Sequence, residues 1–152
     1  MREIKFRGKS TETKLHTAKW RFGSLLTPSN EACKSVIFQR FPKPTRDGNG
    51  YWYEVETETI GQFTGLKDHK GREIYEGDIV KVESYSEESF HVVKYMVEED
   101  YPAFDLAPVL NDGECNSLSY CLNDYDTKIT VIGNIHDNPE LLRLTKNGGL
   151  KK

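Results

Sequence analysis

Short runs of alternating large and polar residues, separated by glycine, proline, asparagine and aspartate, recur along this chain. The longest covers residues 51–60 (YWYEVETETI), where tyrosines, a valine and threonines occupy every second position. Trp52 and three glutamates fill the positions between them. Because successive side chains of a strand point to opposite faces, a period of two indicates a strand with one buried face. Runs so short and so often interrupted predict a mainly β fold.

Similar signals predict further strands at residues 2–7, 19–22, 36–38, 79–82, 90–97, 104–110 and 128–135. The first two would pair as a hairpin. Residues 111–127 are rich in turn formers and are expected to be irregular. A short helix should begin near Asn138 and Pro139, because a capping residue there precedes proline. The turn at Gly77-Asp78 resembles the entry to a strand in SH3-like barrels. We therefore predict a small, SH3-like, partly open barrel with an added N-terminal β-hairpin and a short C-terminal helix.

The charge of the chain is distributed unevenly along its 152 residues. Residues 1–46 carry a balance of +8, residues 47–126 one of −14 and residues 127–152 one of +3. We expect a single domain over 1–152, with a basic hairpin and loops in 1–50, a barrel-like portion in 51–144 and a frayed tail in 145–152. The turn-rich segment 42–50 marks the strongest internal boundary.

The predicted hairpin gathers four basic residues. If residues 2–7 pair with residues 19–25, then Lys5, Arg7, Lys19 and Arg21 share one face, where like charges repel each other. One partner for them is the acidic stripe Glu54, Glu56 and Glu58, within the chain or between subunits. The alternative partner is a nucleic-acid backbone, with Trp20 and Phe41 nearby for stacking. We expect the hairpin to dock on acidic surface of residues 47–100, and Trp20 to contribute more stability than the charges.

The sequence shows no recognisable catalytic constellation. Cys115 and Cys121 lack the spacing of a zinc site, the four histidines are scattered, and neither a nucleophile elbow nor a P-loop occurs. We therefore expect no catalytic residue, no metal and no cofactor, although a cysteine–histidine dyad formed in space stays open. The start of the chain has no apolar run typical of a signal peptide, and no segment suits a membrane helix. We expect a cytoplasmic protein whose three cysteines are reduced.

Three separated blocks resemble the YopX family of phage and prophage proteins. They are MREIKFRG at the start, TIGQFTGLKD with GREIYEGDIV in the middle, and VIGNIHDNPELL near the end. The segment WRFGSL also fits the family. The resemblance implies a mainly β protein with an SH3-like portion, encoded in phage or prophage accessory regions, and it implies no activity or cofactor. It implies structural roles for Gly61, Gly65, Gly71, Gly77, Asp78, Gly133, Asn138 and Pro139.

These observations favour a non-catalytic protein-interaction module in the cytoplasm of a bacterial host. The partner is unidentified, and self-association is one form that the interaction could take. Nucleic-acid binding through the basic hairpin is the first alternative, and an orphan enzyme is the second.

Overall fold

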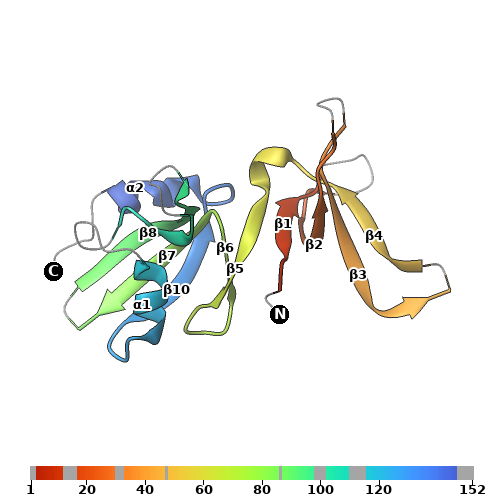
Figure 1. The fold of residues 1–152 in the computed structure, drawn as a ribbon. Coiled ribbons are helices and arrows are strands. Elements are labelled where there is room, and N and C mark those ends of the chain that lie inside the picture. Colours follow the sequence, from red (N-terminus) through yellow and green to blue (C-terminus); the bar gives the residue numbers. More distant parts are fainter. Residues whose placement is uncertain are drawn as a thin grey trace. The chain divides into compact units, whose positions relative to one another are not determined.

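A computed structural model describes residues 3–11, 17–29, 33–46, 48–85, 87–97, 102–109 and 116–146. The chain divides into two compact units, residues 1–63 (unit 1) and 64–152 (unit 2). Antiparallel strands dominate both, which confirms the mainly β prediction (Figure 1). The described strands form open sheets and no closed barrel, and the SH3-like detail stays a prediction. No helix in the described ranges is both long and apolar enough to cross a membrane.

Unit 1 is built on strands β1 (Phe6–Lys9), β2 (Trp20–Leu26), β3 (Val36–Thr45) and β4 (Gly48–Glu54), paired in the order β4-β3-β2-β1. The β1–β2 pair confirms the predicted N-terminal hairpin. A 3-10 helix, η1 (Thr57–Thr59), follows β4, and β5 (Gly61–Lys67) begins beside β1. Ile37 and Val55 are fully buried and form the small core of this unit.

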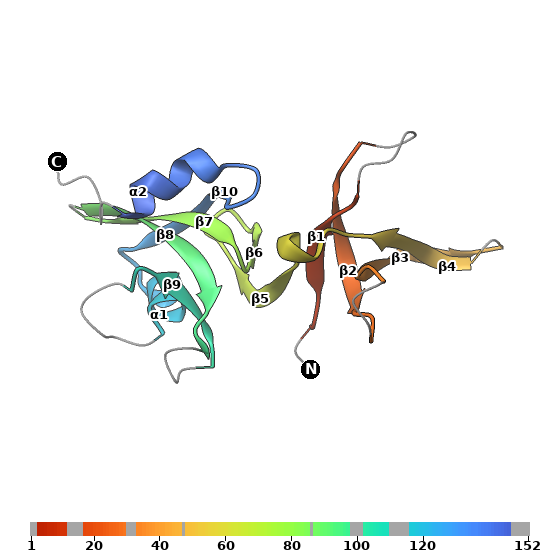
Figure 2. The same ribbon diagram turned by 90° about the horizontal axis from the view of Figure 1, so that it is seen from above.

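Strands β3 and β4 continue beyond the part of β3 that pairs with β2. The β2–β3 register covers only Val36 to Phe38 of β3, whereas β3–β4 pairing runs from Val36 and Glu54 outward to Thr45 and Gly48. The outer part is therefore a two-stranded ribbon (Figure 2). We call this outer part, together with Trp52 and Tyr53 at its base, the ribbon (residues 39–46 and 48–53). The predicted boundary at 42–50 lies within it, and the two compact units meet instead between Phe63 and Thr64.

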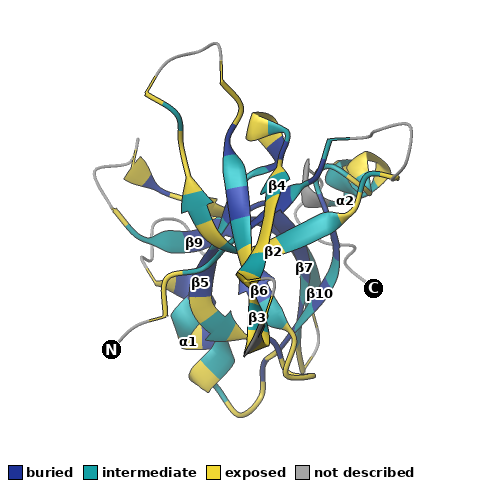
Figure 3. Cartoon of the chain, turned by 90° about the vertical axis from the view of Figure 1, so that its right-hand side faces the viewer, coloured by how far each residue is buried: buried dark blue, intermediate teal, exposed yellow. Residues whose placement is uncertain are grey.

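Unit 2 contains a second sheet in the order β10-β7-β8-β9. Its strands are β7 (Asp78–Ser84), β8 (Glu87–Tyr95), β9 (Phe104–Ala107) and β10 (Lys128–Asn134), and β5 ends in this unit beside β6 (Glu73–Tyr75). Helix α1 (Ser117–Asn123) contacts β9 and β10, whereas η3 (Pro139–Leu141) leads into α2 (Leu142–Lys146), which contacts β8 (Figure 2). The larger core lies here, and much of it comes from β7 and β10 (Figure 3). Helix α2 confirms the predicted C-terminal helix.

Several predicted elements were wrong in extent or type. The strand predicted over 36–38 continues to Thr45, so strand structure extends into the segment 42–50 that was expected to be a loop. The first strand is Phe6–Lys9, not 2–7, and Ile4 is exposed. The strand predicted over 51–60 ends at Glu54, because the Thr59 hydroxyl donates to the Glu56 carbonyl at 2.7 Å and closes a 3-10 turn. Residues 117–123, expected to be irregular, form α1.

Candidate functional site

The predicted cluster of four basic residues does not form on the hairpin. In an antiparallel pair, directly opposed residues share a face, and Arg7 lies opposite Phe22 while Gly8 lies opposite Arg21. Arg7 and Arg21 therefore lie on opposite faces. Arg7 is buried with its guanidinium 4.9 Å from the Trp20 ring centroid, and Arg21 lies over Tyr53 at 3.8 Å. Lys19 is exposed, and the Lys5 ammonium lies 5.2 Å from the Phe63 ring centroid.

The predicted acidic stripe is also absent, because its residues leave the strand. Glu54 ends β4, Glu56 precedes η1 and Glu58 lies in it. The hairpin does contact this segment, but through its backbone: the amide of Glu56 donates to the Lys9 carbonyl at 3.0 Å, and the amide of Thr11 donates to the Glu54 carbonyl at 3.1 Å. The amide of Lys9 donates to the Thr59 hydroxyl at 2.8 Å. Backbone pairing therefore fixes this junction.

Five large apolar side chains gather on one face of the unit 1 sheet. We call this set the apolar face: Phe22 and Leu26 of β2, Val36 and Phe38 of β3, and Trp52 of β4. Leu26 lies opposite Val36 and Phe38 opposite Trp52, with the last two rings 4.4 Å apart. Phe22, Leu26 and Trp52 remain 41%, 51% and 59% exposed. Large apolar side chains grouped in this way on a surface are typical of binding sites.

Glycine at position 50 keeps the apolar face flat. A Cβ atom on Gly50 would lie 2.8 Å from two ring atoms of Phe38 and 2.4 Å from the Gln39 carbonyl oxygen. The Phe38 ring therefore covers Gly50 and reaches Trp52. The exposed Arg40 lies opposite Gly50 and supplies a cation at the rim of the apolar face.

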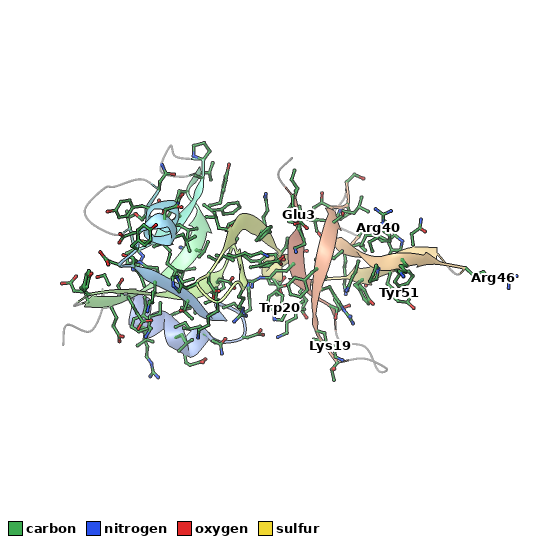
Figure 4. All side chains as sticks on the ribbon, turned by 90° about the horizontal axis from the view of Figure 1, so that it is seen from below. Glu3, Lys19, Trp20, Arg40, Arg46 and Tyr51 are labelled. Carbon is green, nitrogen blue, oxygen red and sulfur yellow. The ribbon has the colours of Figure 1, made fainter. Side chains whose placement is uncertain are left out.

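The opposite face of the ribbon carries a row of aromatic rings. The Phe41 and Tyr51 centroids are 4.7 Å apart and those of Tyr51 and Tyr53 are 6.1 Å apart, both edge-on. Arg21 closes the inner end by lying over Tyr53. Its buried Nε has no hydrogen-bond partner among the described residues, and the guanidinium lies against the ring. Further along the ribbon Lys43 and Arg46 are exposed, and Figure 4 shows Arg46 at its outer end.

The signature residues of unit 2 shape its turns and strand ends. Gly65, Gly71 and Gly77 have positive φ angles of 89°, 79° and 80°, which favour glycine. Asp78 is buried and its Oδ2 accepts from the Tyr75 amide at 2.8 Å. Gly133 is buried, as is the signature residue Gly61 of unit 1, and a Cβ on Gly133 would lie 2.5 Å from the Asn138 Oδ1. Asn138 precedes η3, which Pro139 begins.

Two buried aspartates with comparable roles were missed by the sequence reasoning. Asp68 accepts from the amides of Lys70 and Arg72 at 2.9 and 2.8 Å, and from that of Val131 at 3.0 Å. Asp105 of β9 accepts from the Leu118 amide at 2.8 Å and so holds the start of α1. The available signal was an aspartate within the apolar run Phe104-Asp105-Leu106. Such an acid must have donors around it if the strand is buried.

We considered His91 and Cys121 as candidates for nucleophilic catalysis, and the surroundings of both indicate a structural role. His91 is buried between the Pro108 carbonyl, 2.6 Å from Nδ1, and the Ser89 hydroxyl, 2.7 Å from Nε2, and burial lowers its pKa. Burial, with Asp124 and Asp105 nearby, raises the pKa of the Cys121 thiol to about 11, which disfavours a reactive thiolate. Within the described ranges no three His, Cys, Asp or Glu side chains could hold a metal ion. Cys115 lies outside those ranges.

Comparisons with known proteins place the chain in a family. The family model described as YopX protein matches residues 5–143, so the chain belongs to the YopX family and the predicted resemblance is confirmed. The chain is similar to the crystal structure of protein EF1440 from Enterococcus faecalis, with 28% identity over 92% of this chain and 98% of that chain and a TM-score of 0.49. No curated protein matches.

Proposed function

We propose that this YopX-family protein is a non-catalytic interaction module that binds another protein through the apolar face of unit 1. The observation that carries the proposal is the grouping of Phe22, Leu26 and Trp52, each more than 40% exposed, on one sheet face. Burying such side chains contributes roughly 1.5–3 kcal/mol each, enough for a specific contact. We propose a phage or prophage origin, as the family resemblance implies, and a role in the bacterial cytoplasm.

The composition of the apolar face favours a protein over a nucleic acid. Leu26 and Val36 cannot stack on bases, whereas they fit the apolar centre of a protein interface. Arg40 at the rim would pair with an acidic residue of the partner, since rim charges set orientation and encounter rate. The proposed partner therefore presents an apolar patch bordered by acidic side chains.

The test is quantitative capture from a nuclease-treated lysate of a bacterial host. Wild-type protein is compared with the variants Trp52→Ala and Leu26→Ser, and with Tyr125→Ala, which removes a 99% exposed ring from unit 2. We expect one discrete protein to bind wild type and Tyr125→Ala. Its affinity, measured afterwards with the purified partner, should fall at least about 30-fold in Trp52→Ala, as at an interface hot spot. Equal capture by all four proteins would contradict the proposal.

A further inference from the structure

The ribbon carries a second surface that the apolar face does not use. Phe41, Tyr51 and Tyr53 form a row of rings, and Lys43 and Arg46 lie towards its outer end. Tyr51, in the middle of the row, is 59% exposed. We call these five residues the ribbon site. It contains aromatic rings and cations but no aliphatic side chain, in contrast to the apolar face.

We propose that the ribbon site binds single-stranded nucleic acid, with bases stacked on Tyr51 and phosphates held by Lys43 and Arg46. The proposal concerns the face of β4 opposite Trp52, and it does not depend on the protein contact proposed above.

The charge of the ribbon supports this ligand. Residues 39–53 contain three basic residues, Arg40, Lys43 and Arg46, and one acid, Asp47, which lies outside the described residues. The three cations form no ion pair with a described residue. Unit 1 as a whole has 11 Lys and Arg against 7 Asp and Glu, whereas unit 2 has 10 against 17. A polyanion would therefore be attracted to unit 1 and directed away from unit 2.

The geometry of the row supports single strands in particular. Single-stranded nucleic acids are bound by combining a cationic track with rings on which unpaired bases stack, and every base offers a stacking face. The Phe41 ring supports the Tyr51 ring by an edge-on contact, and the Arg21 guanidinium lies over the neighbouring Tyr53 ring. An exposed ring so supported loses little freedom when a base stacks on it. Bases in a duplex already stack on one another and cannot use it.

The test measures the fluorescence anisotropy of a labelled oligothymidylate of about 15 nucleotides, a length within the usual site size. Full-length wild type is compared with Tyr51→Ala, Tyr51→Phe and the double variant Lys43→Ala/Arg46→Ala. The controls are Tyr125→Ala and Lys67→Ala/Arg72→Ala, which removes the same charge from exposed positions of unit 2. Urea midpoints of all variants are recorded in parallel.

We expect about a tenfold loss of affinity in Tyr51→Ala, recovery in Tyr51→Phe and little change in either control. The double variant should bind more weakly. The slope of log affinity against log salt should also become less steep by about 1.4, the value for two phosphates on a single strand. Three results would each overturn the proposal: no binding at about 50 mM salt, equal losses in the two charge variants, or tighter binding of a duplex of the same length.

Discussion

At the scale of single residues, Asp68 is the side chain on which unit 2 depends most visibly. It is buried and accepts three backbone amides, one of them from Val131 on a strand 63 residues away. Asp68→Ala would leave buried donors unsatisfied, at a cost of about 3 kcal/mol. Urea denaturation should show this loss, with the exposed Glu140→Ala as control. If Asp68→Ala lost no more unfolding free energy than Glu140→Ala, the role assigned to Asp68 would be contradicted.

His91 predicts how stability depends on pH. Burial lowers its folded-state pKa below the ordinary value of 6.5, so the unfolded chain binds more protons in the window just below 6.5. The contribution of His91 is therefore present above pH 6.5 and is lost as the pH falls. Between about pH 7.5 and 5.5, wild type should lose more unfolding free energy than His91→Gln. If both proteins lost the same unfolding free energy over this pH range, a buried neutral His91 would be excluded as the cause of the pH dependence.

Cys33 and Cys121 should differ in their reactivity towards a thiol reagent. Cys121 is buried with a raised pKa, whereas Cys33 is exposed. In folded Cys33→Ser, the Cys121 thiol should stay unmodified by a thiol reagent near neutral pH and react after unfolding, because only the thiolate attacks. Peptide mapping separates its modification from that of Cys115. Rapid labelling of Cys121 in the folded variant would disprove the assignment.

Sequence reasoning located the turn residues Gly71, Gly77 and Asp78, whose structural signals are local. It did not identify Asp68 and Asp105 as buried acceptors, because one amide that binds each of them, that of Val131 and that of Leu118, lies far along the chain. The Leu118 amide is 13 residues from Asp105, and no local pattern shows that the two meet. Burial of a carboxylate is visible only once the donors around it are known.

At the scale of elements, the β1–β2 hairpin shows that the basic residues Lys19 and Arg21 are not equivalent. Arg21 lies over Tyr53, whereas Lys19 is exposed. Arg21→Glu should destabilise the protein by about 1–2 kcal/mol, because it replaces a cation over a ring with an anion. Lys19→Glu should stay within about 0.5 kcal/mol of wild type. Equal urea midpoints for the two variants would show that the Arg21 contact contributes nothing.

Trp20 tests the earlier expectation that rings stabilise this hairpin more than charges do. The ring is partly buried and lies under the Arg7 guanidinium. Trp20→Ala should therefore lower the urea midpoint more than reversing Lys19 and Arg21 together, with a loss of about 3 kcal/mol. A larger loss on charge reversal would make charge the main source of stability.

The sequence predicted strands most accurately where residues alternate with period two and the segment also pairs with a neighbouring strand, as in β7, β8 and β10. Residues 51–60 have a pattern of period two throughout, but the Thr59 hydroxyl bonds to the backbone three residues earlier and competes with the strand. Helix α1 lacks a local cap: Asn116 makes no side-chain cap, and Asp105 of β9 supplies the acceptor instead. Such tertiary caps have no local sequence signature. The two surfaces that we propose for binding were missed for the related reason that strand register decides which side chains share a face.

At the scale of the whole molecule, the charge balance changes sign after residue 46, whereas the two compact units meet between Phe63 and Thr64. The basic excess belongs to unit 1 and the acidic excess to unit 2, but the division falls inside β5 rather than in a linker. For that reason no run of glycine, proline or serine marked it in the sequence. A single domain over 1–152 and a cytoplasmic location stay predictions.

The central claim is that unit 1 presents different binding surfaces on the two faces of one sheet. Tyr51 and Trp52 are adjacent, equally exposed and on opposite faces of β4, so they form a matched pair. The decisive measurement is the affinity of Tyr51→Ala and Trp52→Ala for both the captured protein and the oligothymidylate. We predict opposite selectivity: Trp52→Ala loses mainly protein affinity, by at least about 30-fold, and Tyr51→Ala loses mainly oligonucleotide affinity, by about tenfold. Equal losses of both affinities in both variants would contradict two separate surfaces.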